Sequence, residues 1–326
     1  MNHKLIFLTG HRKGGTTMFH RLFDGHPSLN AYPVDLTVLY AYFPHIISSD
    51  ASTNELWDRL EQVIFLTLER ELTSHQVSLN IDSLKSLFRE KLSDEHLRDP
   101  AKIIGAMLSS WIEHQRLDPT KPIVVKETSA DIFSQEILEW FPNTQFIQLV
   151  RDPRDNYAAL KAGVDRYYSK MGESELTTLA SLINRSLTDM KMALENPSII
   201  GEHRYSTVRF EDLVKNTEEQ MKNMCIFLDI AFDDCLTQPT FMGAATSGNN
   251  HEGKKMAGVS DQNISRWRSR ISDEEAMIIE FAFHGIMEQL NYFPEFSKKD
   301  STRAYAEYYK WSNYHYFFHD PFAIKP

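Results

Sequence analysis

The sequence has few cysteines, no long apolar run and no repeated segment. Its 326 residues include two cysteines, Cys225 and Cys235, which are too few for a disulfide scaffold or a zinc site built on cysteines. No stretch is long and apolar enough to predict a membrane-spanning helix. No charged leader or cleavage site precedes the first expected strand, so we expect a cytoplasmic protein that is not attached to a membrane.

Positive charge is also scarce. The 35 lysines and arginines are outnumbered by 45 aspartates and glutamates, which gives a net charge of -10 at pH 7. Such a balance argues against nucleic acids and anionic membranes as partners. No cluster of His, Cys and carboxylate residues has the spacing of metal ligands, so we expect no metal. Hydrophobic residues make up 42% of the chain, enough for one large domain over residues 1–326.

Short apolar runs alternate with helical patterns along the chain. Alternation of this kind predicts an α/β fold with a doubly wound parallel sheet flanked by helices. Ligands bind such sheets beyond the carboxyl ends of the strands, and Gly10, Lys126, Arg151 and Glu211 all stand at or just after the ends of expected strands. Strands are expected at 5–8, 30–34, 122–126, 145–150 and 205–210, and helices at 131–140, 155–162, 173–194, 217–228 and 272–290.

Two segments stand apart from this alternation. Residues 37–119 are expected to form a mostly helical insertion over the site, rich in aromatic residues whose alternative role is plain core packing. Residues 296–326 form an aromatic tail. Such a tail would pack back on the domain, cover the site or mediate a homo-oligomer contact, and we favour packing back. Capping-box patterns at Thr217/Gln220 and Ser272/Glu275 predict two helix starts.

A glycine-rich turn follows the first expected strand. Residues 10–15 read Gly-His-Arg-Lys-Gly-Gly, and a helix is expected over 16–25. Glycines let backbone N–H groups approach a phosphate, the positive end of the helix dipole faces it, and Lys13 adds a mobile charge. The nucleotide-triphosphate loop differs, because it has a lysine directly after its second glycine, where this chain has Thr16 after Gly15.

The turn, followed by His26-Pro27, resembles the 5′-phosphosulfate loop of sulfotransferases that use 3′-phosphoadenosine 5′-phosphosulfate (PAPS). The Arg-Lys-Gly-Gly-Thr form is similar to the carbohydrate branch, and Ser265-Arg266-Trp267 is similar to the protein-tyrosine branch and its bacterial relatives. The resemblance implies a nucleotide-binding fold of the P-loop type. It also implies a set of donor-binding residues, which are Arg12, Lys13, Gly14, Gly15, Thr16 and Thr17.

Residues 150–155 resemble the family's 3′-phosphate motif, in which an arginine, here Arg151, grips the ribose 3′-phosphate. The planar guanidinium suits this task because it makes bidentate contacts with phosphate. Asp152 is expected to orient the turn and Asp155 to cap the following helix. The chain departs from the family at Ala159, where the resemblance implies a serine, and this removes a hydroxyl donor.

The resemblance implies two further donor contacts. A basic, glycine-containing loop near the C-terminus covers the 3′-phosphate and adenosine in the family, and Lys254 and Lys255 are the candidates here. A solvated lysine pair is the alternative. Residues 208–214 resemble the family's strand ending in Arg-Tyr-Glu-Asp-Leu, with Phe210 in place of the tyrosine. Stacking on the adenine survives that change, whereas a hydroxyl contact does not.

Sulfuryl transfer requires a base for the acceptor hydroxyl, in-line passage of the group and stabilisation of the leaving 5′-phosphate. Lys13 is expected to serve the last need. Asp35 stands where the carbohydrate branch has a glutamate base, although it could instead cap a helix beginning near Leu36. For Lys126, the resemblance implies contact with the transferred group or the acceptor.

Two histidines are weaker alternatives for the base. His20 follows Thr16 by one helical turn, and His26 is expected to hold the turn with Pro27. We therefore predict a sulfotransferase that moves a sulfuryl group from PAPS to a hydroxyl or amine of a small molecule, glycan or peptide, leaving 3′-phosphoadenosine 5′-phosphate (PAP). The alternatives are a non-catalytic PAP-binding relative, suggested by Ala159 and the short carboxylate of Asp35, and a nucleotide kinase.

Overall fold

The computed structural model describes residues 4–39, 49–164, 167–172, 174–246 and 258–319. These residues fall into two compact units. Unit 1 comprises the described residues within 1–150, 192–250 and 254–261, and unit 2 comprises those within 151–191 and 262–326. The helix α9 (Leu187–Ile200) begins in unit 2 and ends in unit 1.

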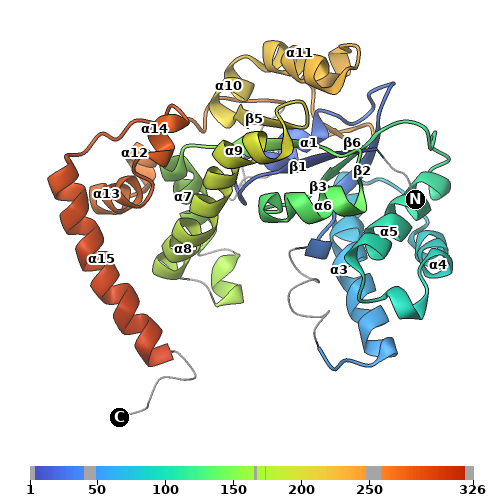
Figure 1. Ribbon diagram of the computed structural model, residues 1–326, viewed down its shortest axis with the longest axis horizontal. Helices are drawn as coiled ribbons and strands as arrows, with labels where there is room; N and C mark the ends of the chain where they lie inside the picture. The colour runs from blue at the N-terminus through green and yellow to red at the C-terminus, as the bar shows by residue number, and fades with distance from the viewer. Residues whose placement is uncertain (1–3, 40–48, 165–166, 173, 247–257, 320–326) are drawn as a thin grey trace. The chain divides into compact units, whose positions relative to one another are not determined.

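Unit 1 is built on a five-stranded sheet (Figure 1). Its strands have the order β2-β3-β1-β4-β5, and every neighbouring pair is parallel. The strands are β1 (Leu5–Thr9), β2 (Asn30–Asp35), β3 (Ile123–Lys126), β4 (Gln145–Val150) and β5 (Tyr205–Arg209). All five expected strands are therefore present, and the predicted doubly wound parallel sheet is confirmed.

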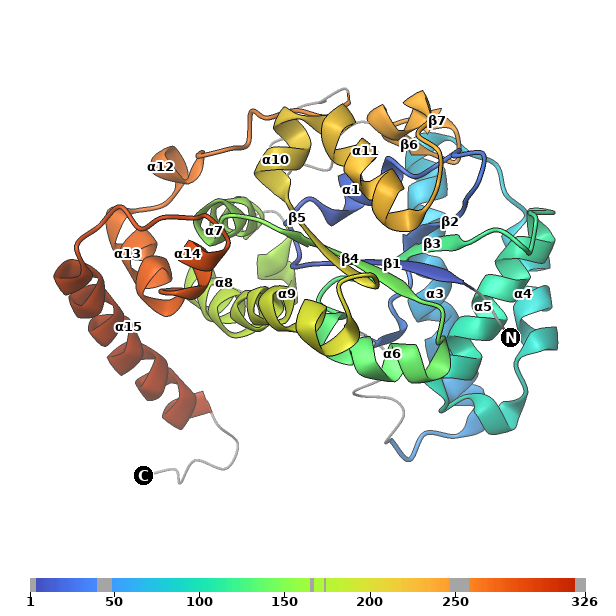
Figure 2. The same cartoon turned by 45° about the horizontal axis from the view of Figure 1, so that its top comes forward.

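Helices cover both faces of this sheet. Figure 2 shows α1 and α11 on one face and α6 on the other. The described part of unit 1 also contains a small antiparallel pair, β6 (Thr240–Phe241) with β7 (Ala244–Ala245). The helices of unit 1 are α1 (Thr16–Arg21), α3 (Thr53–His75), α4 (Ile81–Lys91), η2 (Asp94–His96), α5 (Pro100–His114), η3 (Asp131–Phe133), α6 (Ser134–Trp140), α10 (Phe210–Lys215), α11 (Thr217–Leu228) and η6 (Asp234–Thr237).

The main hydrophobic core of unit 1 lies against one face of the sheet. Phe7 of β1 and Phe146 of β4 pack there with residues of α3, α5 and α6. The described part of the predicted insertion 37–119 is helical, and its Trp57 and Phe65 are 7% and 2% exposed. Core packing is thus the role of these two aromatics, whereas Tyr40, Tyr42 and Phe43 lie outside the described residues.

The described residues of unit 2 form helices joined by loops, and no strand is assigned among them. Its helix α15 packs along α13, with the rings of Phe281 and Tyr305 stacked at 4.5 Å and Tyr308 only 8% exposed. This part of the aromatic tail therefore packs back on its own unit, as favoured. The helices are α7 (Pro153–Lys161), η4 (Tyr168–Met171), α8 (Glu175–Ser181), the π-helix η5 (Leu182–Ser186), α12 (Trp267–Arg270), α13 (Asp273–Ala282), α14 (Ile286–Gln289) and α15 (Lys298–His319).

One of the two expected capping boxes is present. Ser272 and Glu275 exchange the reciprocal hydrogen bonds of a capping box at the start of α13. At α11 the expectation is wrong. That helix follows the N-cap residue Asn216 without a side-chain cap, and the hydroxyl of Thr217 instead donates to the carbonyl of Leu213 at 2.9 Å.

Candidate active site

The glycine-rich loop lies at the point where the sheet changes its direction of winding. β1 is flanked by β3 on one side and β4 on the other, with β2 and β5 at the edges. The carboxyl end of β1 is therefore the topological switch point, where open parallel sheets bind their ligands. Residues 10–15 follow β1 directly and occupy this point.

Two glycines let the loop pack tightly on its surroundings. Gly10 has a φ of +134°, and a Cβ added to it would lie 2.3 Å from the carbonyl oxygen of Leu149 in β4. Gly15 has a φ of +102°, and its added Cβ would lie 2.5 Å from a ring carbon of Phe210. A side chain at either position would meet both steric exclusion and an unfavourable backbone conformation.

The helix α1 starts without a side-chain cap. Its N-cap residue is Gly15, and its first turn contains no acidic residue. The first N–H groups of a helix need acceptors from outside the helix. A bound anion can be such an acceptor, and the helix dipole favours it. This start of α1 thus suits a phosphate or sulfate group.

Lys13 is held within the loop in a left-handed backbone conformation, with a φ of +62°. Burial, together with the positive charge of Arg12, lowers the pKa of Lys13 to about 8. An ammonium group in this position is desolvated and repelled by its neighbour. A bound anion would relieve both effects, which makes Lys13 fit an anionic ligand.

Asp35 and Lys126 are brought together by strand pairing. They are register partners at the carboxyl ends of β2 and β3, and Nζ of Lys126 donates to Oδ1 of Asp35 in an ion pair. Lys126 is 1% exposed, whereas the side chain of Asp35 keeps 28% of its surface open. The carboxylate of Asp35 is therefore fixed by the buried Lys126 and remains partly accessible to solvent.

The capping alternative for Asp35 is wrong. Asp35 is the last residue of β2, and the N–H of Leu36 donates to the carbonyl of Lys126 at 2.8 Å. Thr37 then has a φ of +57°, which a right-handed helix does not allow. The helical residues begin at Val38, two positions later than expected, and Thr37 rather than Asp35 directly precedes them. Asp35 is fixed by the sheet.

The two histidines have different surroundings. Burial lowers the pKa of His20 to about 3, and the positive charge of Lys126 contributes. His20 is 3% exposed, so it is neutral and shielded from solvent. His26 holds a turn as expected, because its Nδ1 accepts from the N–H of Ser28 at 3.2 Å and its Nε2 donates to the carbonyl of Ala231 at 3.0 Å.

Arg151 is the first residue of unit 2 and directly follows β4. It is 9% exposed, and its Nη2 donates to the carbonyl of Asn263 at 2.9 Å. The N-cap of α7 is Asp152. The expectation that Asp155 caps this helix is therefore wrong. The predicted contacts of Lys254 and Lys255 lie outside the described residues.

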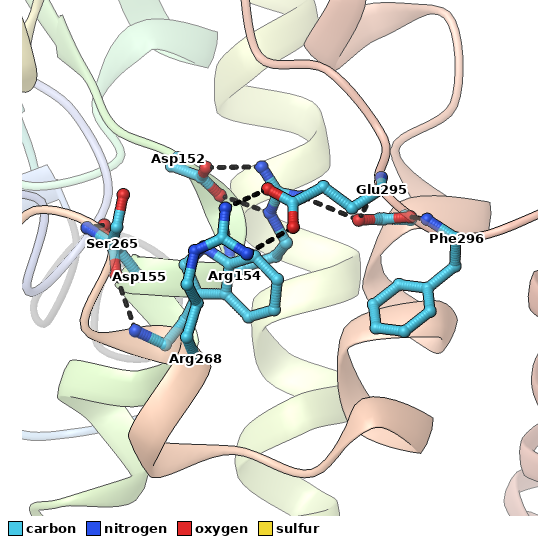
Figure 3. A network of polar contacts seen from close by, with 9 residues as sticks. Asp152, Arg154, Asp155, Ser265, Arg268, Glu295 and Phe296 are labelled. Carbon is cyan, nitrogen blue, oxygen red and sulfur yellow. Dashed lines mark hydrogen bonds and ion pairs between the residues drawn. The ribbon is translucent and has the colours of Figure 1, made fainter.

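Unit 2 contains a buried polar network that the sequence did not predict (Figure 3). Arg154 pairs with Asp152 at 2.8 Å and with Glu280 at 2.6 Å. Glu280 in turn accepts from the N–H groups of Glu295 and Phe296. The motif Arg-Asp-Pro-Arg identifies Arg151 from the sequence. No local pattern indicates that Arg154 pairs with Glu280, which lies more than one hundred positions further along the chain.

Comparison with known proteins gives the family. A profile described as the sulfotransferase family matches residues 6–234, which is more than half of the chain. The chain belongs to the sulfotransferase family. Protein-tyrosine sulfotransferase A of Caenorhabditis elegans is 22% identical over 229 residues, covering 70% of this chain and 50% of that protein.

Another relative is omega-hydroxy-beta-dihydromenaquinone-9 sulfotransferase Stf3 of Mycobacterium bovis, 22% identical over 247 residues, or 71% of this chain and 64% of that protein. The match thus spans about half to two thirds of the length of these two relatives. Among solved structures, the sulfotransferase domain from the curacin biosynthetic pathway has a TM-score of 0.59 at 18% identity, covering 90% of this chain and 99% of that one.

The mouse sulfotransferase SULT7A1 complexed with PAP has a TM-score of 0.50 at 12% identity, covering 95% of this chain and 90% of that one. These likenesses confirm the sulfotransferase fold predicted from the loop. Within the part of the chain that the structure describes, no helix is long and apolar enough to cross a membrane. The same described residues contain no group of three or more His, Cys, Asp or Glu that could hold a metal ion.

Proposed function

We propose that this sulfotransferase moves a sulfuryl group from PAPS to a hydroxyl or amine acceptor. The observation that carries the proposal is the loop at the switch point. There, a helix start without a side-chain cap and a desolvated Lys13 stand together, in a chain whose family transfers sulfuryl groups. The complex of SULT7A1 with PAP supports this nucleotide as the product.

The transfer is one in-line displacement. The acceptor oxygen forms a bond to sulfur as the bond between sulfur and the 5′-phosphate oxygen breaks, and the electron pair of that bond stays on the phosphate. We assign the acceptor proton to Asp35, whose carboxylate is partly exposed at the end of β2. Lys13 stabilises the charge that grows on the leaving phosphate.

The buried position of Lys126 favours a positioning role. With 1% of its surface exposed and its Nζ bonded to Asp35, Lys126 orients the carboxylate rather than reaching a substrate. In donor binding we assign the 5′-phosphosulfate to residues 12–17 and the 3′-phosphate to Arg151. Adenine stacking by Phe210 and contacts from Lys254 and Lys255 complete the proposal.

The chain acts as one functional domain in the cytoplasm, without metal, on a small-molecule, glycan or peptide acceptor. The relatives bear on this acceptor only through their names, which include a protein-tyrosine enzyme and a menaquinone-derived one. A homo-oligomer through the aromatic tail stays a prediction.

Replacement of Lys13 tests the proposed function. We expect Lys13→Ala to lower the turnover number for sulfuryl transfer by about 100-fold or more, because a preorganised charge at the leaving group is lost. PAP affinity should fall about tenfold, since one charge-assisted hydrogen bond disappears. Turnover is followed as PAP release over a panel of phenols, alcohols and amines, and affinity by titration calorimetry.

The matched control is Lys102→Ala, which removes one exposed lysine from α5 in the same unit. It should leave both quantities unchanged. Wild-type protein that neither binds PAP nor transfers sulfuryl groups would contradict the proposal. Tight PAP binding without turnover on the whole panel would favour a non-catalytic relative, and ATP-dependent, magnesium-dependent transfer would favour a kinase.

A further inference from the structure

Asp35 stands at the end of an edge strand whose pairing is irregular. In the sheet, β2 has a neighbour on one side only, which is β3. The pairing of the two strands shifts register between Ala31 and Asp35, and Pro33, which lies between them, has no N–H to donate to a ladder. The pairing of Asp35 with Lys126 is therefore a short end segment, and its position depends also on the residues that follow it.

Thr37 attaches this end of β2 to α3, which packs along the strand. The N–H of Leu36 still donates to the carbonyl of Lys126 in β3 at 2.8 Å. The hydroxyl of Thr37 lies 2.9 Å from the carbonyl oxygen of Val63 in α3 and 2.7 Å from that of Leu36, and it shares its proton between them. Two positions after the carboxylate, the chain is thus bonded to a second element besides β3.

The backbone of Thr37 is strained. Its φ of +57° lies in the left-handed region, where a β-branched residue is rarely found. Glycine or asparagine would adopt this conformation at a lower cost. Strained residues persist where the surrounding structure holds them, and they cluster at functional sites. The hydroxyl bond to α3 is the contact that a glycine at position 37 could not make.

The helix α3 is also attached to the helix that follows the glycine-rich loop. Arg21 is the last residue of α1, and its Nη2 lies 2.5 Å from Oε2 of Glu71 in α3. The two side chains are only 7% and 21% exposed, so solvent screens this ion pair less than one at the surface. α3 therefore joins the helix that we assign to the donor and the strand end that carries the proposed base.

We propose that Thr37 is a positioning residue for Asp35. Its hydroxyl holds the end of β2 against α3, and the pair of Glu71 with Arg21 fixes α3 relative to α1. The carboxylate is thereby placed with respect to the donor. This inference rests on the proposed function, in which Asp35 takes the acceptor proton, and Thr37 acts on the reaction only through the place of that carboxylate.

Removal of the hydroxyl tests this role. We expect Thr37→Val, which keeps the branched shape, to lower the turnover number by about 10- to 100-fold, because a displaced base costs rate. PAP affinity should not change, and Thr37→Ser, which keeps the hydroxyl, should retain most of the turnover. In an Asp35→Asn background, Thr37→Val should cause no further loss, since no base is left to position. Turnover is followed as PAP release, at high enzyme concentration for the slow variants.

The matched control is Thr73→Val, which removes an exposed hydroxyl of α3 that donates to the carbonyl of Glu69 at 2.8 Å. It should change neither turnover nor PAP affinity. Thr37→Val with wild-type turnover, or with an equal loss in the Asp35→Asn background, would overturn the role of Thr37 and leave the proposed function intact. Wild type without sulfuryl transfer would overturn both. If Thr37→Val fails to fold, Thr37→Gly, which relieves the positive φ but also lacks the hydroxyl, decides by the same two comparisons.

Discussion

The ion pair between Lys126 and Asp35 joins two residues that lie 91 positions apart in the chain. Each was singled out from the sequence, Lys126 by its place at a strand end and Asp35 by the resemblance. Their contact follows from the register of β2 on β3. Removing one partner of a buried pair leaves an uncompensated charge, so Asp35 contributes to stability as well as to the proposed chemistry.

Replacement of Asp35 separates these two contributions. We expect Asp35→Asn to lower the turnover number by about 100- to 10,000-fold, the usual range for a lost general base, while PAP affinity changes little. The melting temperature should also fall, because Lys126 loses its partner. Asp35→Glu should retain part of the turnover, since a carboxylate is still present.

The control for this experiment is Asp82→Asn, an exposed aspartate in the first turn of α4. It should change neither turnover nor melting temperature. A folded Asp35→Asn protein with turnover close to that of wild type would show that another group takes the proton.

At the scale of the elements, the packing around the loop between β1 and α1 explains why glycine occupies positions 10 and 15. The sequence indicates an anion-binding turn from its glycines, the expected helix that follows them and Lys13. That Gly15 lies against the ring of Phe210 depends on the packing of α10, which local sequence does not encode. The resemblance, in turn, had suggested only an adenine contact for Phe210.

We expect Gly15→Ala to destabilise the protein by about 1–3 kcal/mol, because a Cβ would meet the ring of Phe210 and the positive φ is strained. PAP affinity should fall with it, since the loop must shift. Thermal and chemical unfolding measure the first effect and calorimetry the second.

Gly25→Ala is the matched control. Gly25 has a φ of +81°, and a Cβ added to it would meet nothing within 4 Å. It should cost about 1 kcal/mol for the backbone conformation alone and leave PAP affinity unchanged. Equal losses of PAP affinity in the two variants would mean that the contact with Phe210 has no part in donor binding.

For the molecule as a whole, Asp155 links pH to stability. Asp155 is 1% exposed, and burial raises its pKa from 3.8 to about 6, although Arg151 and the bonded N–H groups of Ser265 and Trp267 oppose this. A carboxyl group with a raised pKa in the folded state stabilises fully below its unfolded pKa. That contribution is lost as pH rises through about 6.

We therefore expect the unfolding free energy of wild type, relative to Asp155→Asn, to fall between pH 4 and pH 7. The decrease should be up to roughly 3 kcal/mol, from 1.36 kcal/mol per pKa unit. Chemical denaturation of both proteins across this range measures it. Asp273→Asn, an exposed aspartate at the start of α13, should show no such trend, and a difference that grows with pH would contradict the assignment.

The sequence by itself determined the five strands, the parallel sheet, the phosphate-type loop and the family, because hydrophobic periodicity and glycine spacing are local properties. The tertiary structure alone decided that Lys126 pairs with Asp35, and that Asp155 bonds to Ser265 and Trp267 instead of capping α7. These contacts join distant segments, and they depend on strand register and helix packing, which no short stretch of sequence specifies.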